Sequence, residues 1–73
     1  MTVRFASLSD IREFVSLATL QPYNVKVLDG DRVVDAKSFM EMFTIDFAHP
    51  LHVDVGENTS SFALAAKKFI CES

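Results

Sequence analysis

The chain has 73 residues, a formal net charge of −3 and a hydrophobic fraction of 49%. This length allows one domain over residues 1–73, and a folded chain of this size buries only about 60% of the surface that its unfolded form exposes. The core is therefore thin and leaves no room for a deep active-site cavity. The apolar content and the scarcity of glycine and proline exclude an intrinsically disordered chain.

Cysteine, histidine and charge narrow the function classes further. Cys71 is the only cysteine, and with two histidines it supplies neither an internal disulfide nor a structural zinc site. We therefore expect no metal, no cofactor and a reducing, cytoplasmic location. No stretch reads as a signal peptide or a membrane span, so no membrane partner is expected. The acidic balance also argues against a nucleic-acid partner, because only Lys67 and Lys68 are adjacent cations.

The first third of the chain alternates strand and helix patterns. Residues 2–6 and 23–28 alternate apolar and polar side chains, as a half-buried strand does. Between them, residues 8–19 repeat apolar side chains at intervals of three and four, which predicts a helix. Ser7 precedes Asp10 by three residues and is the expected cap of this helix. The side chains expected on its inner face are Leu8, Ile11, Phe14, Val15 and Ala18.

A hairpin and a short helix are predicted in the middle of the chain. The D-G-D sequence at 29–31 is typical of a tight turn, because glycine tolerates the positive φ that such a turn needs. Residues 32–36 form the next predicted strand. Ser38 and Glu41 have the S-x-x-E spacing of a helix start, and the helix is expected to end near residue 44.

The remaining elements complete a βαββαβα order. Residues 51–55 alternate as a strand, and Thr59 or Asn58 is the expected cap of a last helix. The apolar positions expected to bury that helix are Phe62, Ala65, Ala66, Phe69 and Ile70. One apolar face on each element predicts an α+β fold with the helices packed on one side of an antiparallel sheet.

Two segments carry a family resemblance: V-D-A-K-S-F-M-E-M-F at 34–43 and L-H-V-D-V-G-E at 51–57. Together with the element order, they resemble HPr, the small phosphocarrier family of the bacterial sugar phosphotransferase system. The resemblance implies an open-faced β-sandwich, in which a four-stranded antiparallel sheet carries three helices on one face. It also implies protein partners among the phosphotransferase-system components or their regulators.

The family's active-site histidine has no counterpart in this chain. In HPr proteins a histidine at the start of the first helix, within an L-H-x-R-P run, carries the phosphoryl group, whereas residues 6–12 here read A-S-L-S-D-I-R. The carboxylate of Asp10 would repel a phosphoryl group, although Arg12 has the charge to attract one. We therefore expect no enzyme activity and no phosphoryl transfer to histidine.

Ser38 matches the serine that a dedicated kinase phosphorylates in many members of this family, so the resemblance implies regulatory phosphorylation there. Its spacing to Glu41 explains a serine by helix capping alone. The two roles are compatible, because a phosphate at a helix N-terminus is electrostatically favourable.

The histidines and the cysteine have no predicted chemistry. His49 and His52 are three residues apart, but Pro50 makes a helix unfavourable there, so the two rings need not point to one place. No third ligand stands at a suitable spacing, and we predict turn and surface histidines rather than a metal site. Cys71 next to Glu72 is expected to behave as an inert apolar side chain.

Residues 39–47 contain more apolar side chains than a two-turn helix buries on one stripe. Phe39, Met40, Phe43 and Phe47 are therefore candidates for a partner-binding surface, because exposed aromatic patches mark interaction sites. The alternative is that Met40, Phe43 and Phe47 fill a small core that needs large side chains. The sequence leaves both interpretations open.

Three functions fit these patterns. The first is a regulatory or protein-interacting HPr-like domain without the active-site histidine. The second is a working phosphocarrier that uses an unrecognised acceptor. The third is a dimerisation module that forms a weak homodimer through the predicted helix at residues 39–44.

Overall fold

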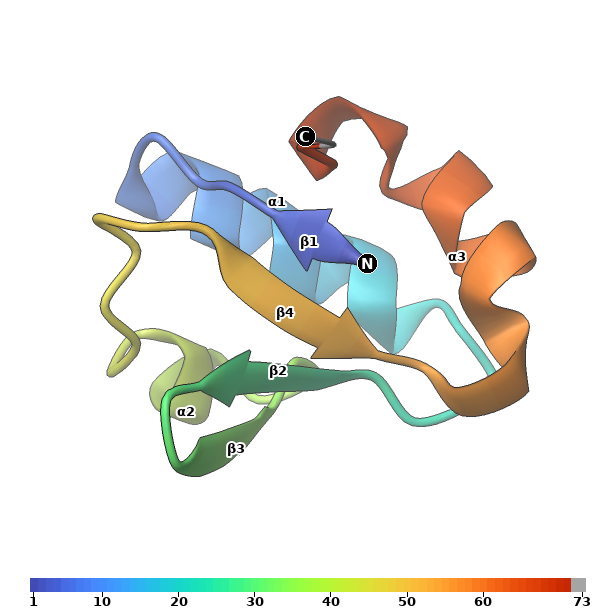
Figure 1. The fold of residues 1–73 in the computed structure, drawn as a ribbon, viewed down its shortest axis with the longest axis horizontal. Helices are drawn as coiled ribbons and strands as arrows, with labels where there is room; N and C mark the ends of the chain where they lie inside the picture. The colour runs from blue at the N-terminus through green and yellow to red at the C-terminus, as the bar shows by residue number, and fades with distance from the viewer. Residues whose placement is uncertain (72–73) are drawn as a thin grey trace.

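The computed structural model describes residues 1–71. A four-stranded antiparallel sheet carries helices on one face, as the sequence predicts (Figure 1). The elements in chain order are β1 (Thr2–Val3), α1 (Leu8–Thr19), β2 (Lys26–Asp29), β3 (Arg32–Asp35), α2 (Phe39–Met42), β4 (Leu51–Asp54), the 3₁₀ turn η1 (Gly56–Asn58), α3 (Thr59–Ala65) and the 3₁₀ turn η2 (Lys67–Phe69). Within residues 1–71 no helix is long and apolar enough to cross a membrane.

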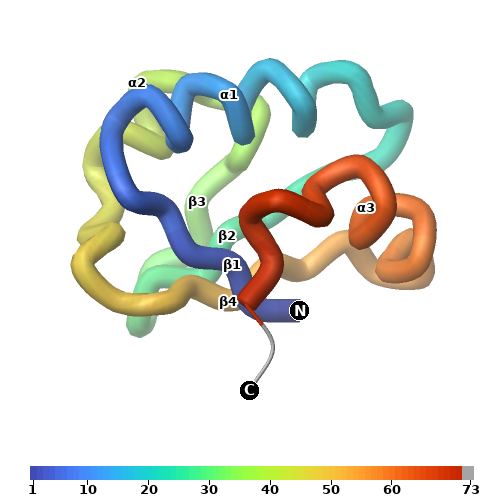
Figure 2. Tube along the Cα trace, turned by 90° about the horizontal axis from the view of Figure 1, so that it is seen from above, coloured from blue at the N-terminus to red at the C-terminus, as the bar shows by residue number. Residues whose placement is uncertain are grey.

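The strands lie in the order β1-β4-β2-β3, and each neighbouring pair is antiparallel. β2 and β3 form the predicted hairpin. Its turn contains Gly30, whose φ of 62° is unfavourable for any residue that has a Cβ atom. β4 lies between β1 and β2, with Val53 opposite Val27. Figure 2 shows α1 and α2 on the same side of the strands, so the sheet has one covered and one open face.

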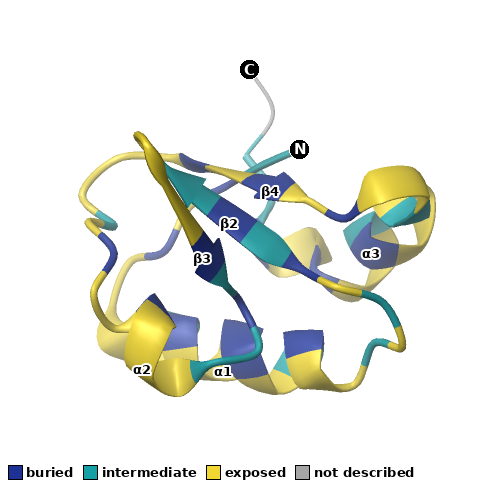
Figure 3. Ribbon diagram, turned by 90° about the horizontal axis from the view of Figure 1, so that it is seen from below, coloured by how far each residue is buried: buried dark blue, intermediate teal, exposed yellow. Residues whose placement is uncertain are grey.

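Alternation along the strands separates these two faces (Figure 3). The side chains predicted to face the helices are all buried: Val3, Phe5, Val25, Val27, Leu51, Val53 and Val55. The side chains of Lys26, His52 and Asp54 alternate with them and lie on the open face. This confirms the predicted open-faced sandwich.

Four phenylalanine rings join the helices to the sheet. Phe14 on α1 is fully buried, and its ring makes edge-to-face contacts with Phe5 at 5.0 Å, Phe69 at 5.6 Å and Phe62 at 5.7 Å between centroids. Such aromatic pairs stabilise a fold by about 0.5 to 1.5 kcal/mol each beyond their burial. The same ring therefore joins α1 to the N-terminal segment, to α3 and to η2.

The predicted first strand is too long, because β1 covers only Thr2–Val3. Beyond it the chain pairs with the C-terminal segment: Arg4 donates its N–H to the Phe69 carbonyl, and Cys71 donates to the Thr2 carbonyl, both at 2.9 Å. An isolated bridge between Val3 and Ile70 lies between these bonds. The C-terminal segment thus covers the outer edge of β1.

The predicted last helix is also too long. It ends at Ala65 and is followed by η2, because Ile70 has to reach the edge of β1 in an extended conformation. Ala65 is exposed, contrary to the prediction, whereas Ala66 is buried. Lys68 on η2 forms an ion pair with Glu13 on α1, and this hydrogen bond raises the pKa of Lys68.

Two smaller predictions fail near helix starts. Leu8, expected on the inner face of α1, is 58% exposed, because the buried stripe of this helix begins at Ile11. Asn58 precedes α3 but does not cap it, since its amide donates to the Val55 carbonyl at 3.1 Å. Thr59 does not cap it either, because its hydroxyl donates to the Gly56 carbonyl.

We expect Phe14→Ala to lower the free energy of unfolding by about 3 to 5 kcal/mol, because it leaves a cavity among the three other rings. Denaturant unfolding followed by circular dichroism measures the change. Leu64→Ala is the matched control: Leu64 is 80% exposed, and its loss should cost less than about 0.5 kcal/mol. Equal destabilisation by the two substitutions would contradict this description of the core.

Candidate functional site

Ser38 determines where α2 begins. Its backbone is extended, with a φ of −107° and a ψ of 114°, and its hydroxyl accepts a hydrogen bond from the Glu41 N–H at 3.3 Å. In a full S-x-x-E capping box the Glu41 carboxylate would accept from the Ser38 N–H, but that N–H donates to the Asp35 carbonyl at 3.0 Å. The Glu41 carboxylate instead accepts from the N–H of Asp35 at 3.2 Å. Glu41 therefore ties α2 to the edge strand β3 rather than closing the helix on itself.

Only one side chain of α2 belongs to the core. Met42 is fully buried, whereas Met40 is 84% exposed, Phe39 41% and Phe43 46%. The rings of Phe39 and Phe43 lie side by side, with centroids 5.8 Å apart. We call Phe39, Met40 and Phe43 the apolar α2 surface. Large apolar side chains clustered on the outside of a small domain are typical of an interaction site.

The packing interpretation of residues 39–47 is wrong for Met40 and Phe43, which are exposed, and holds in part for Phe47. Met42 and Ile45 are buried in the core, but that interpretation did not name them. Phe47 is half-buried and packs against the core from outside. Phe39, Met40 and Phe43 remain exposed. Of the four predicted partner-binding residues, these three form the candidate site.

Polar contacts from the β2–β3 hairpin hold the chain that follows α2. The guanidinium group of Arg32 donates to the carbonyl of Thr44 at 3.1 Å and to its hydroxyl at 2.6 Å. The carboxylate of Asp29 accepts from the N–H of Asp46 at 3.2 Å. Because Arg32 and Thr44 are twelve residues apart, no local pattern in the sequence indicated this support.

The start of α1 is the place where the family resemblance would put a phosphorylated histidine. Ser7 caps this helix as predicted, and its hydroxyl accepts from the N–H of Asp10 at 3.4 Å. The Asp10 carboxylate folds back and accepts from the N–H of Ala6 at 2.9 Å. The positive end of the helix dipole is thus met by a carboxylate of the chain itself, which disfavours a second anion there.

The two histidines lie elsewhere. His52 is on the open face of the sheet, where its Nδ1 is 3.3 Å from the Thr2 hydroxyl. His49 lies in the loop before β4, with its Nε2 3.7 Å from the Asp46 carboxylate. Within residues 1–71 no three histidine, cysteine or acidic side chains are grouped closely enough to hold a metal ion.

Comparison of the chain with protein-family models, with curated proteins and with solved structures finds no match. The likeness to HPr proteins therefore rests on the segments at 34–43 and 51–57 and on the element order.

We expect Ser38→Ala to lower the free energy of unfolding by about 0.5 to 2 kcal/mol, because it removes the only side-chain cap of a four-residue helix. Ser60→Ala is the control, since the Ser60 side chain is exposed and makes no hydrogen bond within residues 1–71. Thermal unfolding of both variants measures the difference. If Ser38→Ala is as stable as Ser60→Ala, the cap does not hold α2.

Proposed function

We propose that this chain is a non-catalytic, HPr-like interaction domain that binds a protein partner through the apolar α2 surface. The proposal rests on one observation. Met42 is buried and holds α2 in the core, whereas Phe39, Met40 and Phe43 are exposed and available to a partner. Aromatic and methionine side chains are enriched at the centres of protein interfaces.

The start of α1 supports a role without phosphoryl transfer. Residues 6–12 contain no histidine, and Asp10 occupies the helix end that would have to stabilise a phosphate. A phosphocarrier with another acceptor is the alternative. It would need a nucleophile beside an anion-stabilising group, whereas the group 3.7 Å from the His49 Nε2 is the carboxylate of Asp46.

The size of the apolar α2 surface favours a different protein over a second copy of this chain. A stable interface buries about 800 Å² on each partner, which is roughly a sixth of the 4531 Å² that this chain exposes. Three side chains on one short helix supply only the centre of such a contact. A partner with an apolar groove, among the phosphotransferase-system components or regulators that the resemblance implies, would enclose them.

Ser38 is our proposed regulatory phosphorylation position. Its hydroxyl is the cap of α2 and lies within hydrogen-bonding distance of the Glu41 backbone. A phosphate on this oxygen would place two negative charges beside the residue whose carboxylate ties α2 to Asp35. Phosphorylation would then alter the surface that the partner contacts.

The decisive variant is Met40→Asp. Because Met40 is almost fully exposed, we expect unfolding free energy to change by less than about 0.5 kcal/mol while partner binding falls at least tenfold. Leu64→Asp is the control, because Leu64 is equally exposed but lies on α3. Affinity capture identifies the partner, and titration of the purified partner against both variants measures binding.

Three outcomes separate the candidate functions. Loss of binding in Met40→Asp alone supports the interaction domain. Equal binding of the two variants would contradict it. A concentration-dependent dimer that disappears in Met40→Asp, seen by sedimentation of the purified chain, would favour the dimerisation module instead.

Incubation with phosphoenolpyruvate and enzyme I tests the phosphocarrier alternative directly. We expect no acid-labile phosphate on His49 or His52, because neither lies at the start of a helix. Mass spectrometry at neutral pH detects the modification, and an authentic HPr protein provides the positive control. A phosphohistidine at either position would overturn the non-catalytic proposal.

A further inference from the structure

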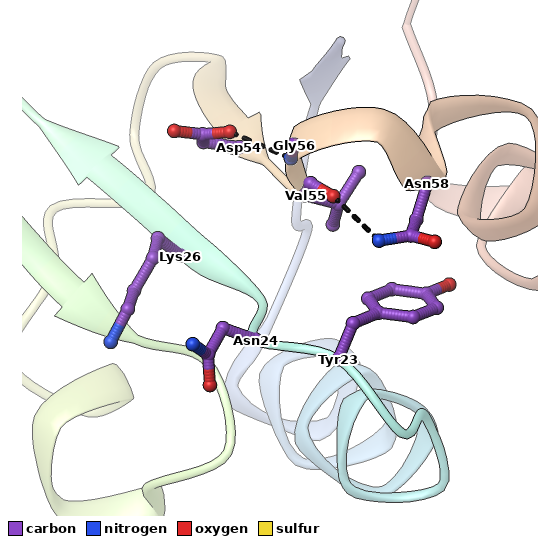
Figure 4. Close-up of a pocket in the computed structure, with 7 residues that line it drawn as sticks. All are labelled: Tyr23, Asn24, Lys26, Asp54, Val55, Gly56 and Asn58. Carbon is purple, nitrogen blue, oxygen red and sulfur yellow. Dashed lines mark hydrogen bonds between the residues drawn. The ribbon is translucent and has the colours of Figure 1, made fainter.

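A hollow of about 370 Å³ opens where β2 and β4 separate (Figure 4). Lys26 and Asp54 form the last pair of the β2–β4 ladder. In the same register Val25 and Val55 would form the next pair, and Asn24 and Gly56 the one after it. Gly56 instead has a φ of 62° and donates its N–H to the Asp54 carboxylate at 2.9 Å. The ladder therefore stops, and the two strands diverge around the hollow.

Several polar groups at the hollow have no hydrogen-bond partner among residues 1–71. No hydrogen bond within residues 1–71 involves the side chain of Asn24 or of Lys26. Asn58 donates its amide hydrogen to the Val55 carbonyl at 3.1 Å, which leaves its side-chain oxygen free to accept. One oxygen of Asp54 is free in the same way. The free groups are thus both donors and acceptors.

The hollow also has an apolar wall that is held in place. The ring of Tyr23 lines it and contacts Phe62 edge-to-face, with centroids 6.5 Å apart. The Tyr23 hydroxyl donates a hydrogen bond to the Gln21 side chain at 3.2 Å, which fixes the ring. The buried Val55 also lines the hollow. A flat apolar ligand face can pack against such a ring.

The charges of the lining cancel, because Lys26 is its one cation and Asp54 its one anion. A ligand with net charge would be attracted by one of these groups and repelled by the other. A neutral ligand whose groups both donate and accept meets every free group without a charge conflict. Sugar hydroxyls have this property, and the C–H face of a sugar ring is apolar.

We propose that this hollow binds a neutral monosaccharide, with its hydroxyls on Asn24, Lys26 and Asn58 and its C–H face against the ring of Tyr23. The volume lies at the lower end of the range for small-molecule pockets, which suits one sugar ring. The proposal does not depend on the interaction role of the apolar α2 surface, since the two sites share no residue.

Nuclear magnetic resonance of the uniformly ¹⁵N-labelled chain tests the proposal. Glucose, mannose, galactose and ribose are titrated separately, with glycine and inorganic phosphate as the zwitterionic and anionic arms. We expect saturable shifts of the Asn24, Gly56 and Asn58 amide signals with at least one sugar, at a millimolar dissociation constant. Absence of saturation with all four sugars, or saturation only with glycine or phosphate, would overturn the proposal.

Asn24→Ala tests whether the response belongs to this hollow. Because its side chain makes no hydrogen bond in the fold, the variant should keep a dispersed spectrum while binding the sugar at least tenfold more weakly. Glu57→Ala is the control, since Glu57 is exposed next to the hollow but is not part of its lining. Unchanged sugar affinity in Asn24→Ala would assign the shifts to another surface and refute the site.

Discussion

The burial of the Phe14 ring is the contact on which the two layers of this domain depend. It brings α1 against Phe5, Phe62 and Phe69, which come from the two ends of the chain. None of the other elements is long enough to be stable alone: β1 has two residues and α2 has four. In so short a chain, one aromatic cluster therefore has to hold the termini and the central helix together.

The apolar α2 surface is available because α2 lies outside this cluster. The helix is held by Met42 in the core, by the hydrogen bond that the Asp35 N–H donates to Glu41, and by the bonds that Arg32 donates to Thr44 just after the helix. Hydrogen bonds that fix the backbone do not use the other side chains of the helix. Three large apolar groups can then remain exposed without weakening the core, which is the arrangement that a docking surface needs.

The sequence predicts those features that depend on local periodicity. The seven side chains that strand alternation placed on the inner face are all buried, because the two-residue period is independent of what the strand pairs with; the buried Val34 of β3 was not among them. The caps at Ser7 and Ser38 were also local and were confirmed. The apolar repeat predicted helix through Ile70, but pairing with Val3 at the other end of the chain overrode it.

The candidate site could be predicted only in part for the same reason. The spacing of Phe39, Met40 and Phe43 around a helix requires that some of them protrude, whatever the tertiary structure. The half-buried position of Phe47 depends on the path of the loop to β4. The contact between Arg32 and Thr44 holds the start of that path, and no sequence pattern predicts this contact. The hollow beside Asn24 likewise arises from the point at which two distant strands part.

The hydrogen bonds at the start of α1 and those that fix α2 involve different residues. A docking role for α2 is therefore separate from a phosphoryl-transfer role at the start of α1. The hydrogen bonds that fix α2 involve Ser38, Glu41 and Arg32 and none of the residues from 6 to 12. The hydrogen bonds of Asp10 stay within the start of α1. Under our proposal, a chain of this fold that has no histidine at the start of α1 still presents the apolar α2 surface to a partner.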